Sequence, residues 1–272
     1  MARSNSYENN LKMIYQEFSE DGRLVAEGSY AVGYFGCDEL LGPEDKVKHG
    51  PWKFYDTNGM IKSEISYSAD YVDLKNNIKH VTCGAYKTFW PNGLCSAEGT
   101  YRPDSKSLLD SGLRARYGAI LSSSDRTGLW ETYHRNGVRA SIGCYGRGGL
   151  AVGLWIYYHE NGNLKSLGVK TNDAHGFSDN YPYEGTYKEY FENGVLKTVK
   201  EFDAGRLCEN TAYYENGNLK CIEHREFNSQ CFRGLCSYFH ENGIIKQEKE
   251  YSGDGRLLTE KNYDMFGKLV LS

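Results

Sequence analysis

One short unit recurs along the whole of this 272-residue chain. It contains Gly-x-Trp or Gly-x-Tyr, an aromatic pair, Asn-Gly or Asp-Gly, an aliphatic residue and a closing Tyr, as in Gly50–Tyr67. Asn-Gly or Asp-Gly between apolar runs is a strong signal for a β-hairpin. The repeat therefore predicts an all-β protein built from about ten hairpins in a row.

The units share an aromatic residue at a fixed distance from the turn glycine. The turn glycines are Gly22, Gly59, Gly93, Gly137, Gly162, Gly194, Gly217, Gly243, Gly255 and Gly267. Four residues before each stands Phe18, Tyr55, Phe89, Tyr133, Tyr158, Tyr190, Tyr213, Phe239, Tyr251 or Tyr263. Aromatic residues make up only 14 % of the chain, so this regularity is not chance.

The turn chemistry explains this spacing. A type I turn whose third residue is a left-handed glycine places the aromatic residue opposite the residue two positions after the glycine. That residue is Leu or Ile in eight of the ten units, the exceptions being Cys95 and Arg139. Such aromatic–aliphatic pairs contribute about 0.2–1 kcal/mol each and set the register of the sheet.

The distances between the turns predict the architecture. We expect one domain over residues 1–272, an elongated antiparallel β-meander or solenoid of hairpins. Residues in excess of the repeat form insertions at 31–49, 68–83, 102–127 and 170–184, and only 102–127 has room for a helical turn. Alternate turns of a meander lie on opposite edges, so every insertion is expected on the edge away from the Asn-Gly turns.

The insertions supply the candidate binding residues, because loops lengthened on one side of a repeat scaffold typically shape a binding surface. They carry exposed aromatic and charged residues of the kind that is enriched in protein interfaces. The predicted partner-binding residues are Tyr34, Phe35, Asp38, Glu39, Tyr71, Asp73, Arg114, Arg116, Tyr117, Phe177 and Tyr181.

The sequence offers no arrangement typical of catalysis. His134, His159 and His240 occupy a repeat position, three residues before the turn glycine, that also accepts Asp56 and Trp90. A position this tolerant is a sheet-surface position, not a catalytic one. The remaining candidate metal ligands have no repeated ligand spacing; they are His49, His80 and His175, with Asp173 or Cys83. We therefore expect no enzymatic activity, no cofactor and no metal.

Composition and charge argue against several classes of function. The net charge of −4 and the pI of about 6.0 give no reason to expect nucleic acid, whose binders carry a basic stripe. No apolar run is long enough to cross a membrane, and the polar N-terminal residues do not form a signal peptide. The eight cysteines contain no Cys-x-x-Cys pair, which is typical of reduced thiols. A cytoplasmic protein is expected.

The unit Gly-x-Trp-x-x-Tyr-x-x-Asn-Gly-x-Leu-Lys, as in Gly50–Lys62 and Gly153–Lys165, resembles the variant MORN repeat of bacterial proteins. The resemblance covers nearly the whole chain apart from the insertions. Ordinary MORN repeats are closer to Tyr-x-Gly-x-Trp-x-x-Gly, and this chain departs from them by placing Asn-Gly after an aromatic pair. The resemblance implies a non-catalytic binding protein of the antitoxin or immunity type.

The leading hypothesis is a cytoplasmic bacterial protein that neutralises a protein partner, such as a toxin or effector, by direct contact. One alternative is a structural scaffold or membrane-proximal module, for which a basic stripe would be expected. Another is a small-molecule-binding protein with a pocket among the insertions, lined by Arg114 and Arg116. Open sheet edges also make self-association a fair expectation.

Overall fold

The computed structural model describes residues 14–31, 47–68, 81–103, 124–146, 149–171, 183–226 and 231–270. These residues form eighteen β-strands and no α-helix, which confirms the all-β prediction. None of the described residues belongs to a helix long and apolar enough to span a membrane. The chain divides into two compact units, residues 1–137 with 145–150, and residues 138–144 with 151–272. The single-domain expectation stays a prediction.

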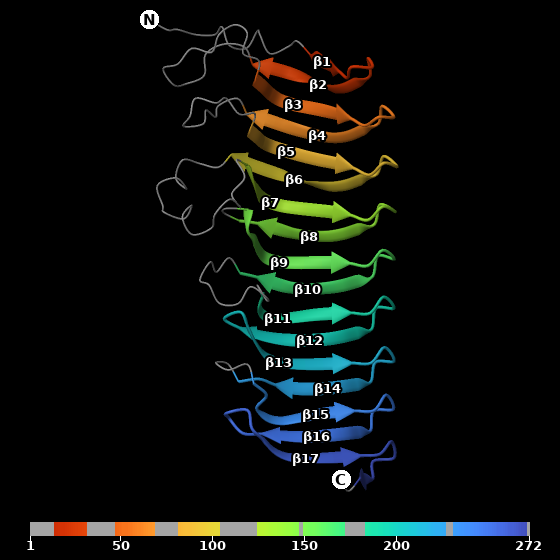
Figure 1. Cartoon of the computed structure of the whole chain (residues 1–272), viewed down its shortest axis with the longest axis vertical. Coiled ribbons are helices and arrows are strands. Elements are labelled where there is room, and N and C mark those ends of the chain that lie inside the picture. The colour runs from red at the N-terminus through yellow and green to blue at the C-terminus, as the bar shows by residue number, and fades with distance from the viewer. Residues whose placement is uncertain are drawn as a thin grey trace, which may run out of the picture. The chain divides into compact units, whose positions relative to one another are not determined.

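In the first unit each strand pairs antiparallel with the next, in sequence order (Figure 1). Its strands are β1 (Tyr15–Phe18), β2 (Leu24–Ala31), β3 (Val47–Tyr55), β4 (Ile61–Ser68), β5 (Val81–Phe89), β6 (Cys95–Pro103) and β7 (Ser124–Tyr133). This is the predicted meander.

The second unit repeats the same arrangement, with antiparallel neighbours in sequence order from β9 to β18. Its first strands are β8 (Arg139–Tyr145), β9 (Ala151–Tyr158), β10 (Leu164–Lys170), β11 (Tyr183–Tyr190), β12 (Leu196–Asp203) and β13 (Arg206–Tyr213). The others are β14 (Leu219–His224), β15 (Gly234–Phe239), β16 (Ile245–Tyr251), β17 (Leu257–Tyr263) and β18 (Leu269–Val270).

The turns have the predicted geometry. In the β3–β4 hairpin the amide of Gly59 donates to the Asp56 carbonyl at 3.1 Å, and the amide of Asp56 donates to the Met60 carbonyl at 2.9 Å. All ten turn glycines have φ between +78° and +88°, a region in which a Cβ would be strained. Tyr55 lies opposite Ile61, and the equivalent pair is present in eight other hairpins. The predicted register is confirmed.

Directly after this pair the register shifts by one residue, which the sequence pattern did not reveal. Phe54 lies opposite Ser63, so that Lys62 is skipped in the register and Ile61 and Ser63, although two residues apart, belong to opposite faces of the sheet. Counting positions from the turn glycine, we call the side of positions −7, −5, +4 and +6 the core face. We call the side of positions −8, −6, −4, +2, +5 and +7 the ladder face.

The buried residues lie on the core face and not with the aromatic residues at −4. Trp52, Trp130 and Trp155, all at position −7, are only 1 %, 2 % and 5 % exposed. The aromatic residues at −4 are half-buried, apart from Phe18, which is exposed. The core of the first unit therefore contains Trp52 and Trp130, and the core of the second unit contains Trp155 with buried Phe202, Cys221 and Cys236.

Each core tryptophan lies against a glycine and under a cation. A Cβ added to Gly28 would stand 2.3 Å from the Trp52 ring, and the Lys48 ammonium lies 4.1 Å from the centre of that ring. Trp130 has the same relation to Gly99 and Arg126, and Trp155 to Gly143 and Lys170. Glycine at +6 is needed here because the neighbouring ring occupies the space of a side chain.

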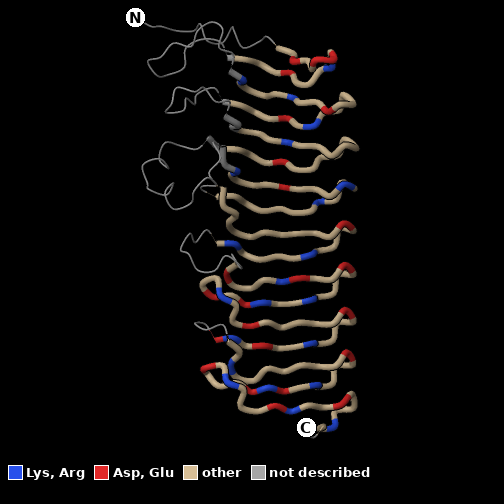
Figure 2. The backbone as a smooth tube through the Cα atoms, viewed as in Figure 1, with Lys and Arg blue, Asp and Glu red and all other residues tan. Residues whose placement is uncertain are grey.

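The Asn-Gly turns are joined to one another along their edge, which is marked by acidic residues in the second unit (Figure 2). The Asn216 Nδ2 donates to the Glu241 carbonyl of the next turn at 2.9 Å, while its Oδ1 accepts the Asn218 amide at 2.9 Å. Asn92, Asn161, Asn193 and Asn242 make equivalent pairs of bonds. Asn is therefore both a turn former and a link between repeats.

The position of the histidines has a similar structural explanation. The Nε2 atom of His159 lies 3.0 Å from the Tyr190 carbonyl of the next hairpin, and His240 makes the same contact with Tyr263 at 3.1 Å. Trp90 donates to the equivalent Tyr133 carbonyl. These side chains link neighbouring hairpins, in agreement with the expectation of a sheet-surface position.

Asn216→Asp is expected to destabilise the second unit by about 1 kcal/mol, because the carboxylate keeps the acceptor but loses the donor to Glu241. Urea unfolding followed by circular dichroism measures the effect. Asn58→Asp is the matched control, since Asn58 occupies the same turn position but donates no such bond to a described residue. Equal losses in both variants would contradict the linking role.

The opposite edge carries the attachment points of the insertions. The last pairs before them are Ala31–Val47, Ser68–Val81, Pro103–Ser124 and Lys170–Tyr183, all at the strand ends away from the Asn-Gly turns. The predicted bounds 31–49, 68–83, 102–127 and 170–184 are too wide, because the strands extend into 47–49, 81–83, 124–127 and 183–184. What remains of each insertion between its flanking strands, apart from Thr171, lies outside the described residues.

Candidate functional site

A row of alternating charges crosses the ladder face of the first unit. Glu27, Lys53, Glu64, Lys87 and Glu98 lie on β2 to β6, one on each strand, and each faces the next in the register. Opposite charges in directly facing cross-strand positions stabilise the pairing by about 0.2–1 kcal/mol each. The row therefore has a structural role, and it also presents a fixed charge pattern on the surface.

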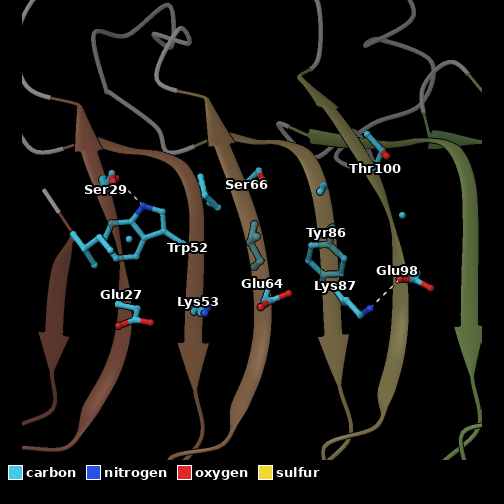
Figure 3. Close-up of a pocket in the computed structure, with 16 residues that line it drawn as sticks. Glu27, Ser29, Trp52, Lys53, Glu64, Ser66, Tyr86, Lys87, Glu98 and Thr100 are labelled. Atoms are coloured by element: carbon cyan, nitrogen blue, oxygen red, sulfur yellow. Dashed lines mark hydrogen bonds and ion pairs between the residues drawn. The ribbon is translucent and has the colours of Figure 1, made fainter. Parts of the chain in front are cut away.

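Beside the charged row runs a row of small side chains. It consists of Ser29, Pro51, Ser66, Ala85 and Thr100, again one on each strand from β2 to β6. The two rows border a hollow of about 590 Å³, which we call the groove (Figure 3). Its volume lies within the range of about 300–1,000 Å³ that is typical of ligand pockets.

The groove opens on the ladder face. Each of the five strands contributes three consecutive residues to it, such as Glu27, Gly28 and Ser29. Because side chains alternate between faces, the outer two of each three point to the ladder face. The middle residue, such as Gly28 or the buried Trp52, belongs to the core face. The small row therefore allows a ligand to approach the backbone closely.

The charges of the groove are held by hydrogen bonds. The Tyr55 hydroxyl donates to Glu27 at 2.6 Å, which lowers the pKa of that carboxyl and raises the pKa of Tyr55 to about 12. The Lys87 ammonium lies 3.2 Å from Glu98, and this contact raises the pKa of Lys87. Glu27 and Lys87 are therefore charged at neutral pH.

The Tyr55→Phe variant is expected to raise the pKa of Glu27, because the largest contribution to its lowering is the hydroxyl donor. The Glu27 carboxylate would then be protonated at a higher pH as the solution is acidified. Carbon-detected NMR titration of the side-chain carboxyl measures the shift. Tyr213→Phe in the second unit serves as the control, and a Glu27 pKa that stays the same in Tyr55→Phe would contradict the assignment.

Acidic residues outnumber basic ones along this row. On β7, Glu131 faces Glu98, and the Tyr133 hydroxyl lies 2.6 Å from Glu98 and 2.9 Å from Glu131. Such a hydroxyl bridge reduces the repulsion that two facing carboxylates otherwise cause. From β2 to β7 the row thus contains four Glu and two Lys, and its formal charge is negative.

The arrangement is suited to binding by charge and shape. The sixteen residues that line the groove include no His, Cys or Asp. Among the described residues, no group of three or more His, Cys, Asp or Glu is placed to hold a metal ion. Six of the cysteines are free thiols, namely Cys95, Cys144, Cys208, Cys221, Cys231 and Cys236.

The ladder face of the second unit is different in character. Leu154 on β9 faces Val169 on β10, and these side chains are 52 % and 42 % exposed. In the adjacent row Ile156 faces Leu167. On β8, Ile142 belongs to the same face because its neighbours, Ser141 and Gly143, are buried on the other. This region offers an apolar surface instead of a charged groove.

The partner-binding residues predicted from the sequence all lie outside the described residues. These are Tyr34, Phe35, Asp38, Glu39, Tyr71, Asp73, Arg114, Arg116, Tyr117, Phe177 and Tyr181.

The groove was not predicted from the sequence, although the spacing of its charged residues is visible there. Lys53 and Lys87 stand six residues before their turn glycines, and Glu27, Glu64 and Glu98 stand five residues after theirs.

Comparison with known proteins identifies the repeat. Six segments match the family model of the MORN repeat variant, namely residues 48–69, 126–145, 151–169, 183–204, 209–226 and 233–252. The chain is therefore a MORN-repeat protein. MORN arrays are repeat-based binding or scaffold modules, and the family is generally non-catalytic. No curated protein matches the chain.

Solved structures give only distant likenesses. The Tc holotoxin pore of Photorhabdus luminescens is 11 % identical over 94 % of this chain, with a TM-score of 0.21. Complexes of TcdB2–TccC3 with Cdc42 and with TEV are 10 % and 11 % identical, each over 95 % of this chain, with TM-scores of 0.17 and 0.18. This chain spans 13–18 % of those chains. Scores this low establish neither a shared fold nor a shared partner.

Proposed function

We propose that this MORN-repeat protein is a non-enzymatic binding protein that acts by direct contact with a protein partner, and that the groove of the first unit is part of the contact surface. The observation that carries this proposal is that the charged row and the row of small residues lie side by side across β2 to β6. Fixed charges give orientation and specificity, and small side chains permit close approach.

In this proposal the partner is a toxin or effector that the protein neutralises stoichiometrically in the cytoplasm, as an antitoxin or immunity protein does. The insertion residues, such as Tyr34 and Arg114, would extend the contact beyond the groove. The match to the MORN repeat variant supports a binding role, and the negative formal charge of the row favours a basic surface on the partner.

The test is purification of the tagged full chain from its host, with the mass and stoichiometry of the bound protein measured. Ala85→Arg fills the groove with a long side chain and is expected to reduce the recovered complex about tenfold or more. Thr259→Arg, an equally exposed strand position of the second unit, is the control. A complex that survives Ala85→Arg unchanged would remove the groove from the proposal.

A second candidate function, an assembly scaffold, is favoured by the exposed apolar pair Leu154 and Val169. Exposed apolar surface of this kind is typical of protein interaction sites, and self-association would bury it. Sedimentation velocity of the wild type and of Leu154→Glu tests this role. A monomeric wild type at all concentrations would exclude self-association through this surface.

A further inference from the structure

We propose that the groove binds a basic segment of the partner in the polyproline II conformation, with Lys or Arg at every third residue. This inference rests on the proposed function and specifies which chemistry the groove recognises. It is carried by the spacing of the charges across the strands, their sign, and the chemistry of the residues between them.

The first step is the spacing of the carboxylates. Glu27, Glu64 and Glu98 lie on β2, β4 and β6, on every second strand, and their row is continuous through the register. Neighbouring strands are about 4.8 Å apart, which places successive carboxylates of this row about 9.6 Å apart. A ligand that crosses the strands must repeat its basic side chains at this distance.

Only one regular backbone conformation repeats at that distance. A polyproline II helix has three residues per turn and rises about 3.1 Å per residue, so that residues on one side recur every 9.3 Å or so. An α-helix presents the same side about every 5.4 Å, and after seven residues at about 10.5 Å. A β-strand presents it after about 6.7 Å. Over two intervals polyproline II departs from the groove by only about 0.6 Å.

The lysines between the carboxylates fit the same ligand. Lys53 on β3 and Lys87 on β5 stand between the glutamates and supply ammonium donors (Figure 3). A polyproline II backbone has no internal hydrogen bonds, so that its carbonyl groups are free to accept them. The groove thus alternates a group that binds a basic side chain with a group that binds the ligand backbone.

The row of small residues and the length of the groove both agree with an extended ligand segment. The row of small residues, which includes Ser66 and Ala85, leaves room for a backbone to lie along the groove. Crossing from β2 to β6 covers four strand spacings, or about 19 Å. Seven residues of polyproline II, with basic residues at the first, fourth and seventh positions, cover this length.

The experiment uses the full chain and two fluorescent peptides of identical composition. One consists of four Pro-Pro-Arg triplets, and the other carries the same four Arg at alternate positions followed by the remaining Pro. The triplet peptide is expected to bind at least about five times more tightly at low salt, where surface charges are least screened. Equal affinity for both peptides would overturn the proposed spacing.

A variant in which the three carboxylates of the row are neutralised identifies the site. Glu27→Gln with Glu64→Gln and Glu98→Gln is expected to weaken binding of the triplet peptide about tenfold. The control, Glu201→Gln with Glu209→Gln and Glu250→Gln, has the same net charge and changes only the second unit. Equal losses in the two variants would mean non-specific attraction and would overturn the proposal. Circular dichroism checks the fold of both, and Glu64→Gln alone replaces the triple variant should that misfold.

The remaining outcomes separate this inference from the proposed function. Binding of a Pro-Pro-Glu triplet peptide to the wild type at similar strength would exclude recognition of basic side chains. A protein complex that Ala85→Arg disrupts, together with no binding of the Pro-Pro-Arg peptide, would leave the proposed function in place and overturn this inference. If Ala85→Arg weakens neither the protein complex nor the binding of the Pro-Pro-Arg peptide, the groove is removed from the proposed function and this inference is overturned.

Discussion

Replacing Trp52 by alanine is expected to lower the free energy of unfolding of the first unit by about 3–5 kcal/mol. The indole is 1 % exposed and its ring centre lies 4.9 Å from that of Tyr30. Its Nε1 also donates to the Ser29 carbonyl at 2.8 Å. The variant removes the ring, leaves a cavity beside Gly28, and leaves the Ser29 carbonyl without the Nε1 donor. Urea unfolding followed by circular dichroism measures the loss.

Two further variants define the cause of this effect. Trp52→Phe keeps an aromatic ring but loses the Nε1 donor, and an intermediate loss is expected. Phe266→Ala removes an aromatic side chain that is 83 % exposed, and its effect is expected within about 0.5 kcal/mol. A similar loss of unfolding free energy in Phe266→Ala and Trp52→Ala would show that Trp52 is not part of the core.

The hairpin register could be predicted from the sequence because local chemistry decides it. A glycine with positive φ fixes the turn, and the turn fixes which residue faces Tyr55. No information from elsewhere in the chain is needed. The same local reasoning placed the insertions on the edge away from the Asn-Gly turns, and the strand pairs that flank them are found there.

The location of the core could not be predicted in this way. The aromatic residues at −4 are the more regular ones in the sequence, but Trp52 lies three residues before Tyr55 and therefore on the other face. The register shift then places Ser63 on the face of Trp52, although Ile61, two residues earlier, faces Tyr55. Periodicity alone does not report such an irregularity. The glycine at +6, as in Gly143, was a usable signal, because a glycine inside a strand indicates the close approach of another group.

The groove depends on long-range pairing. Lys53 and Glu64 belong to one hairpin and their facing positions follow from its turn. Glu27 and Lys53, however, come from hairpins separated by an insertion, and their register becomes known only when β2 and β3 are seen to pair. The predicted binding residues were sought in the insertions, whereas the groove is formed by the repeats themselves.

Replacing Gly143 by alanine is expected to destabilise the second unit by about 1–3 kcal/mol. A Cβ at this position would stand 2.2 Å from the Trp155 ring, a distance that forces the ring or the strand to move. The backbone conformation is not the obstacle, because Gly143 is not among the glycines with positive φ. Gly253→Ala, at a position with no atom within 4 Å of the added carbon, is the control and is expected to be nearly neutral.

A double-mutant cycle tests whether the contact with Trp155 is the reason. In a Trp155→Ala background the collision disappears, so that Gly143→Ala is expected to cost little there, and even to stabilise the strand by about 0.5 kcal/mol through the lower entropy of the unfolded chain. The coupling energy between the two substitutions would then be about 1 kcal/mol or more, as is found for side chains in direct contact. An equal cost of Gly143→Ala in both backgrounds would mean that the glycine is required for a reason other than its packing against Trp155.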